Sequence, residues 1–377
     1  MQVELYNLDP VLRLMATGLL VAAVPLAWLT WRQRHALPAQ RLKALTLLTL
    51  LLTFELVLVG AFTRLTDSGL GCPDWPGCYG SVSPLGAHAE ISAAQDAMPT
   101  GPVTHGKAWM EMVHRYMATG VGVLIIVLCA LTWRQHQRDR SLAVNPWWPT
   151  LTLFWVCLQG AFGAWTVTMK LFPAIVTLHL LLAVGLLLLL TAQAVRYEGW
   201  KSVPLPVRMR RFLWLALALL VLQIALGGWV STNYAVLACN GFPACNGQWW
   251  PDFDGAGFAL WRPLGHAVDG QILPFSALVS IHYIHRSMAW LVLAVLLILG
   301  WCLRKQVGLQ RPARALLALS VLQFFTGLSN VVLGWPLVSA VLHTGGASAL
   351  AIVLTWALAL SASSEASRSS FDSRLVA

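Results

Sequence analysis

Nine apolar runs divide the chain, and each is long enough to cross the roughly 30 Å hydrocarbon core of a bilayer. With 58% hydrophobic and 11% charged residues, the composition excludes a soluble globular domain. The sequence therefore predicts an all-α, polytopic membrane protein. Its expected spans cover about residues 12–31, 43–64, 109–132, 147–168, 172–195, 211–231, 279–302, 313–333 and 335–361.

The basic residues gather in alternate connections, which argues against a nucleic-acid partner despite the net charge of +10. They cluster at about 32–43, 134–140, 196–211 and 304–314, and in the C-terminal tail. The positive-inside rule places these segments in the cytoplasm. We therefore expect a bacterial inner-membrane protein with a periplasmic N-terminus and a cytoplasmic C-terminus. No cleavable signal peptide is expected, because the first run follows Glu4 and Asp9 instead of a basic region.

An internal duplication organises most of the chain. Three sets of residues recur in the same order: a cysteine pair at an offset of 167 positions, a His-Arg pair at 171, and a Gln, Gly and His set at 164. They predict an additional N-terminal helix (1–42) followed by two tandem four-helix-bundle repeats (43–200 and 201–377). Because each repeat has an even number of spans, both enter the membrane in the same sense, which implies a parallel pseudo-twofold.

Each repeat contains one cysteine pair in a long connection on the outer side. In an oxidising compartment, neighbours of this spacing predict two local disulfides, Cys72–Cys78 and Cys239–Cys245. A structural crosslink and a redox-active role both remain open.

Four histidines lie at one depth near the outer ends of four spans, roughly 8–12 Å below the surface. They are His114 and His179 in the first repeat, and His285 and His343 in the second. An imidazole is costly in hydrocarbon, and paired imidazoles can hold haem iron from both faces. The pattern predicts one porphyrin per repeat, against the alternative that each ring is a hydrogen-bonded core group.

The residues beside the first histidine of each pair differ in an informative way. Arg115 and Arg286 are candidates to bind a haem propionate or, equally, to reach lipid headgroups. Glu111 precedes His114 by one turn, whereas the second repeat has His282 there. An acid beside a haem edge can move protons, so we expect the first repeat to be the chemical site and the second to hold an electron-transfer haem. Simple interfacial solvation of Glu111 is the alternative.

Three segments and the last histidine helix resemble the haem A synthase family, over about residues 45–362. The segments are 60–78 (Gly-Ala-Phe-Thr-Arg-Leu-Thr-Asp-Ser-Gly-Leu-Gly-Cys-Pro-Asp-Trp-Pro-Gly-Cys), 111–115 (Glu-Met-Val-His-Arg) and 281–286 (Ile-His-Tyr-Ile-His-Arg). The resemblance implies successive hydroxylation of the C8 methyl of haem O to the formyl of haem A. It implies that His114 and His179 hold the substrate haem, that His285 and His343 hold haem b, and that Glu111 is the catalytic acid.

The same resemblance bears on partners and topology. It implies association with haem O synthase (protohaem farnesyltransferase) and cytochrome oxidase assembly factors. It does not indicate which oligomeric state the protein adopts. Family members commonly have eight spans, so the helix at 12–31 is a departure. A dihaem b-type electron carrier would need the same four histidines, and a duplicated transporter would suit parallel repeats. Both alternatives remain open at this point.

Overall fold

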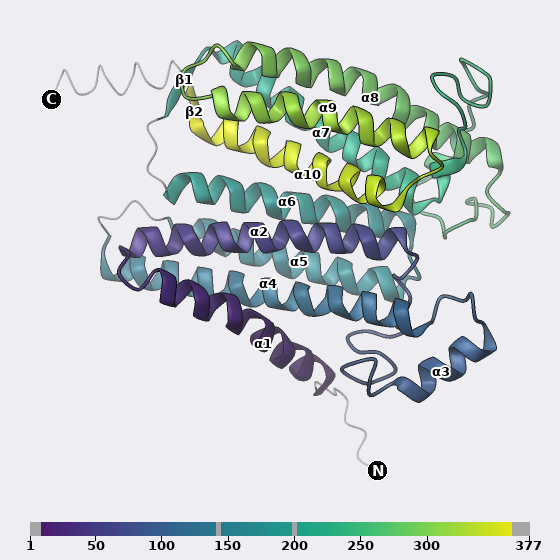
Figure 1. The fold of residues 1–377 in the computed structure, drawn as a ribbon, viewed down its shortest axis with the longest axis horizontal. Helices are drawn as coiled ribbons and strands as arrows, with labels where there is room; N and C mark the ends of the chain where they lie inside the picture. The colour runs from purple at the N-terminus through teal and green to yellow at the C-terminus, as the bar shows by residue number, and fades with distance from the viewer. Residues whose placement is uncertain (1–8, 141–144, 198–201, 364–377) are drawn as a thin grey trace. The chain divides into compact units, whose positions relative to one another are not determined.

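The structure, a computed structural model, describes residues 9–140, 145–197 and 202–363. Within these ranges nine helices are long and apolar enough to cross a membrane, which confirms the predicted polytopic, all-α class. Glu4, Lys201 and the basic C-terminal tail lie outside the described residues. The nine helices, labelled in Figure 1, are α1 (Asp9–Arg32), α2 (Pro38–Leu65), α4 (His105–Arg138), α5 (Trp147–Thr168), α6 (Pro173–Tyr197), α7 (Val207–Thr232), α8 (Phe275–Leu303), α9 (Gln310–Val332) and α10 (Leu337–Leu360).

The chain divides into two compact units, Met1–Leu186 and Leu187–Ala377, and the division falls inside α6. The predicted repeat boundary near residue 200 and the pseudo-twofold stay predictions. In the first unit α4 is the central helix, with α1, α2 and α5 packed against it. In the second unit α7, α8, α9 and α10 contact one another in a closed cycle, which is a four-helix bundle.

The additional helix α1 docks on α4 through small residues, and the two lie side by side in Figure 1. A Cβ added to Gly18 would fall 2.7 Å from the Thr119 Cβ, and one added to Gly120 would fall 2.8 Å from a Val21 methyl. Helices in a membrane associate by close van der Waals contact, and small residues permit it. This helix is therefore a packed part of the first unit.

One helix and two short strands were not predicted. A helix in the outer connection, α3 (His88–Ala97), packs on α4, and its Ile91 is fully buried with Cys72, Cys78, Ala108 and Met112. Two short parallel strands, β1 (Val203–Leu205) and β2 (Ser361–Ser363), pair within the second unit.

Both predicted disulfides, Cys72–Cys78 and Cys239–Cys245, are present. Each second cysteine begins the same tight turn. Tyr79 and Gly80 after Cys78 have φ of 49° and 71°, and Asn246 and Gly247 have φ of 51° and 80°. Two successive residues in the left-handed region define the turn that favours glycine at its second position. The two loops thus share a backbone conformation as well as a cysteine spacing.

Candidate functional site

Each of the four histidines lies against a glycine of the preceding membrane-spanning helix. A Cβ on that glycine would come within about 3 Å of the imidazole Cε1, closer than side chains normally pack, so a larger residue there would displace the ring. The contacts pair Gly60 with His114 (2.9 Å), Gly163 with His179 (3.1 Å), Gly227 with His285 (3.0 Å) and Gly327 with His343 (3.1 Å).

The structure brings the histidines together in the predicted pairs. His114 of α4 is close enough to His179 of α6 for the two rings to interact electrostatically, and His285 of α8 stands in the same relation to His343 of α10. All four side chains are only partly buried although they lie in apolar helices. Two imidazoles per unit, each seated on a glycine and each with part of its surface accessible, form a donor set that fits a haem iron.

The groups next to Nδ1 of the histidines differ between the two units. In the second unit, His343 Nδ1 lies 2.9 Å from the Thr326 hydroxyl, and His285 Nδ1 lies 3.1 Å from the Gln223 amide nitrogen. In the first unit, Nδ1 of His114 and Nδ1 of His179 are buried without a hydrogen-bond partner among the described residues.

Glu111 is held rigidly at the outer end of α4. Its carboxylate accepts a hydrogen bond from the Cys72 backbone N–H at 2.8 Å and pairs with the Arg115 guanidinium at 2.5 Å. Both side chains are buried, at 4% and 8% exposure. The acid therefore has two fixed donors and lies one helical turn from His114, as the sequence spacing predicted.

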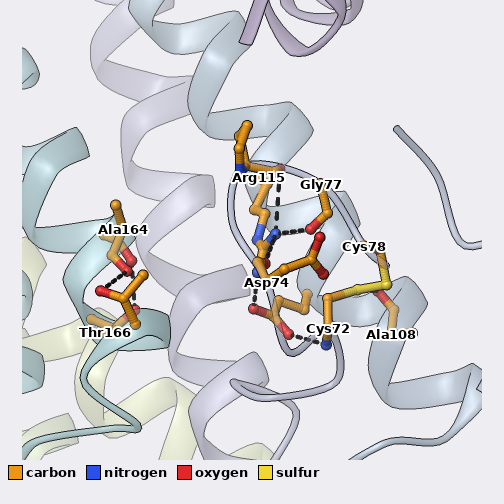
Figure 2. Close-up of polar contacts among 12 residues, drawn as sticks. Cys72, Asp74, Gly77, Cys78, Ala108, Arg115, Ala164 and Thr166 are labelled. Carbon is orange, nitrogen blue, oxygen red and sulfur yellow. Dashed lines mark hydrogen bonds and ion pairs between the residues drawn. A yellow bond between two sulfur atoms is a disulfide. The ribbon is translucent and has the colours of Figure 1, made fainter. Parts of the chain in front are cut away.

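The other terminal nitrogen of Arg115, Nη1, donates to the disulfide loop. It donates to the backbone carbonyls of Asp74 (3.0 Å), Pro76 (3.3 Å) and Gly77 (2.5 Å). Figure 2 shows this guanidinium reaching Asp74 and Gly77 beside the Cys72–Cys78 disulfide. The arginine thus connects the loop to Glu111.

Arg286 does the same in the second unit. It donates to the carbonyls of Cys239 (2.6 Å), Gly241 (2.9 Å) and Ala244 (3.2 Å). His282, at the position of Glu111, contacts the Ala235 carbonyl through Nδ1 at 3.0 Å. Holding the outer loop is a role for both arginines that sequence reasoning missed, and propionate binding by either one stays a prediction.

A sequence motif marks three of the four glycines against which the imidazoles lie, which we call the glycine cradles. Gln-x-x-x-Gly occurs at 159–163, 223–227 and 323–327, each time one helix before a histidine. In all three cases the glutamine contacts the histidine: Gln159 lies 3.4 Å from a ring nitrogen of His179, Gln223 donates to the His285 carbonyl at 3.0 Å, and Gln323 to the His343 carbonyl at 2.8 Å. Before Gly60 the glutamine position is Leu56.

Fold and site together define a multi-span membrane protein that carries a histidine pair in each of two helical units. Comparison with known proteins is consistent with this class. A family model described as cytochrome oxidase assembly protein, COX15-CtaA, matches residues 43–355, and the chain belongs to this family. The helix α1 lies outside the matched range.

Several relatives are named heme A synthase. The protein of Shewanella oneidensis is 38% identical over 311 residues, covering 81% of this chain and 92% of the relative. That of Rhizorhabdus wittichii is 27% identical over 347 residues, covering 86% and 96%. That of Caulobacter vibrioides is 29% identical over 329 residues, covering 81% and 91%. The resemblance expected from the sequence motifs is confirmed.

Proposed function

We propose that this chain is a haem A synthase, an oxidoreductase that converts haem O to haem A in the membrane. The observation that carries the proposal is the carboxylate of Glu111, buried and held by two donors one turn from His114 in a chain of this family. Named relatives that cover most of the chain support the same activity.

The first unit is the site of the reaction. His114 and His179 hold the iron of the substrate haem O, and the glycine cradles set where their rings lie. Oxidation of the C8 methyl to a formyl group by successive hydroxylations removes protons together with electrons. Glu111 is the proton acceptor, and the Cys72 N–H and Arg115 keep its carboxylate in one orientation while it acts.

The second unit holds haem b through His285 and His343. Its cradles, Gly227 and Gly327, match those of the first unit, and its histidines have polar partners at Nδ1. When bound there, haem b would supply one-electron redox chemistry. His282 in place of Glu111 leaves this unit without the carboxylate.

The proposed location is the bacterial inner membrane, with a periplasmic N-terminus and a cytoplasmic C-terminus. The disulfide loops then lie in the periplasm, where disulfides persist. Lipid-soluble haem O would arrive from haem O synthase, and we propose this enzyme and cytochrome oxidase assembly factors as partners.

Expression with a haem O synthase, followed by haem extraction and mass analysis, tests the activity. We expect haem A with the wild-type chain, and its loss by about 100-fold or more with Glu111→Gln while the Soret band persists, because removing a general base costs about 10²–10⁴-fold. Glutamine can still accept the Cys72 N–H, so the loop contact survives. The matched control is Glu55→Gln, since this α2 carboxylate is exposed and should be dispensable.

Two results would contradict the proposal. Absence of any hydroxymethyl or formyl haem with the wild-type chain rejects the enzyme. Unchanged haem A output from Glu111→Gln rejects the role of the acid and favours a dihaem electron carrier, which needs the four histidines and no carboxylate.

A further inference from the structure

The proton position on His343 follows from its contact with Thr326. The Thr326 hydroxyl lies 2.9 Å from the Leu322 carbonyl and 3.3 Å from the Gln323 carbonyl, and 2.9 Å from His343 Nδ1. A hydroxyl has one hydrogen, and the helix carbonyls take it. The oxygen can then only accept, so the proton of the neutral imidazole is on Nδ1. The Nε2 lone pair is left free to bind iron.

The corresponding position in the first unit has no such group. Gln159, Gly163 and His179 align with Gln323, Gly327 and His343, so Phe162 stands where Thr326 stands. Phe162 packs edge-on against Trp165, with ring centroids 5.0 Å apart. His179 Nδ1 is buried with no hydrogen-bond partner within the described ranges, and the Gln159 amide lies 3.4 Å from its Nε2 instead. The side-chain hydroxyl that contacts Nδ1 of His343 therefore has no counterpart at Nδ1 of His179 in the described residues.

The other histidine of each pair repeats the contrast. Gln223 places its amide 3.1 Å from His285 Nδ1, and its Oε1 is a buried acceptor without a partner. The same amide nitrogen donates to the His285 carbonyl at 3.0 Å, so Gln223 contacts both the ring and the backbone of this histidine. In the first unit Leu56 occupies the glutamine position, and His114 Nδ1 has no partner in the part of the chain that the structure describes.

We propose that polar side chains next to Nδ1 of the second-unit histidines keep haem b bound. Their absence from the first unit lets the substrate and product haems exchange. Thr326 and Gln223 are positioning residues that fix the second-unit histidines, and Thr326 strengthens the bond between His343 and haem b. Phe162 and Leu56, at the corresponding positions of the first unit, cannot hydrogen-bond to the first-unit histidines, so haem A can leave and haem O can enter. Groups of this kind orient the ring and raise its basicity, and their removal costs about 10- to 100-fold in metal affinity. The proposal rests on the proposed function, because a substrate site must exchange its haem.

Haem transfer to excess apomyoglobin tests this inference without reference to turnover. The purified holoprotein, made with a haem O synthase, is mixed with apomyoglobin, and the haem remaining on it is extracted over time and identified by mass. We expect haem O and haem A to leave faster than haem b. With Thr326→Val, which keeps the shape and removes the hydroxyl, haem b should leave about 10- to 100-fold faster while haem O and haem A are unchanged. Thr326→Ser, which restores a hydroxyl, should restore the wild-type rate.

A gain of function provides the reciprocal test. Phe162→Thr supplies a hydroxyl behind His179 and should slow the release of haem O and haem A, whereas Phe162→Val opens the same space without a hydroxyl and should not. Wild-type release of haem b from Thr326→Val, or equal effects of the two Phe162 variants, would overturn the inference. Failure to make haem A would reject the proposed function instead, and the release of haem b would still test the role of Thr326.

Discussion

At the scale of single residues, the four glycine contacts explain how a polar ring can be positioned accurately between apolar helices. Each glycine removes a Cβ that would otherwise meet the imidazole Cε1 at about 3 Å. The ring is then located by helix packing as well as by hydrogen bonds. Interiors are close-packed, so an added side chain at such a point must displace the ring.

Gly163→Val should weaken haem binding in the first unit. Overpacking of this kind costs about 1–3 kcal/mol, which is a weakening of roughly 5- to 150-fold if it falls on haem affinity. The measurement is the content of haem O and haem A in the purified protein, with haem b as internal reference. Gly160→Val on the same helix is the control, because a Cβ there meets nothing within 4 Å. Equal haem content in the two variants would show that the contact does not position His179.

The histidines and Glu111 could be selected from the sequence because duplication and depth are visible in residue spacing. Their Nδ1 partners could not. Whether Thr326 reaches His343 depends on how α9 is rotated against α10, and hydrophobic periodicity does not fix that rotation. The destination of the arginines was equally hidden, since Arg115 and Arg286 bind backbone carbonyls of loops whose path no side-chain pattern reveals.

At the scale of elements, each disulfide loop is tied to the helix below it by one arginine. The loop in the first unit also supplies the Cys72 N–H to Glu111, so its conformation sets the orientation of the acid. In the second unit the loop has the same turn and is held by an arginine in the same way, and His282 contacts the Ala235 carbonyl just before that loop. The same local architecture therefore serves a different site in each unit.

Arg115→Lys should loosen the first loop and leave the second unchanged. An ammonium cannot reproduce the planar fork of donors, and each lost charged hydrogen bond costs about 1.5–3 kcal/mol. Hydrogen exchange with mass spectrometry should show faster exchange in residues 72–80 and no change in residues 239–247. Arg286→Lys is the matched variant and should give the opposite pattern. Uniform exchange in both variants would mean that the loops are held by their disulfides alone.

At the scale of the whole molecule, hydrophobic runs located all nine spans but not their ends. The helix α4 covers His105–Arg138 against an expected 109–132, because Thr104 caps its N-terminus and polar residues extend its last turns. The helix α3 was not anticipated at all. A helix of 10 residues is marginal alone, and this one is stabilised by docking Ile91 onto α4.

The orientation proposed from the basic connections is testable with reporter fusions. Green fluorescent protein at the C-terminus should fluoresce, and alkaline phosphatase inserted in the connections at 65–108 or 232–278 should be active, because the enzyme folds only in the periplasm. Phosphatase inserted at 134–146 should be inactive and serves as the control. The reverse pattern would show that the chain has the opposite orientation in the membrane, with both disulfide loops in the cytoplasm.

The buried cluster that contains the first disulfide is built from residues 72–116. Contacts of such short sequence separation can form early, and chains mature in N-terminal order during synthesis. The disulfide loop that holds Glu111 can therefore fold as soon as α4 has crossed the membrane and the thiols of Cys72 and Cys78 have been oxidised. At that time the second unit is still being synthesised. Biogenesis of the acid site then depends on export and oxidation of one loop, and precedes the insertion of the helices that carry His285 and His343.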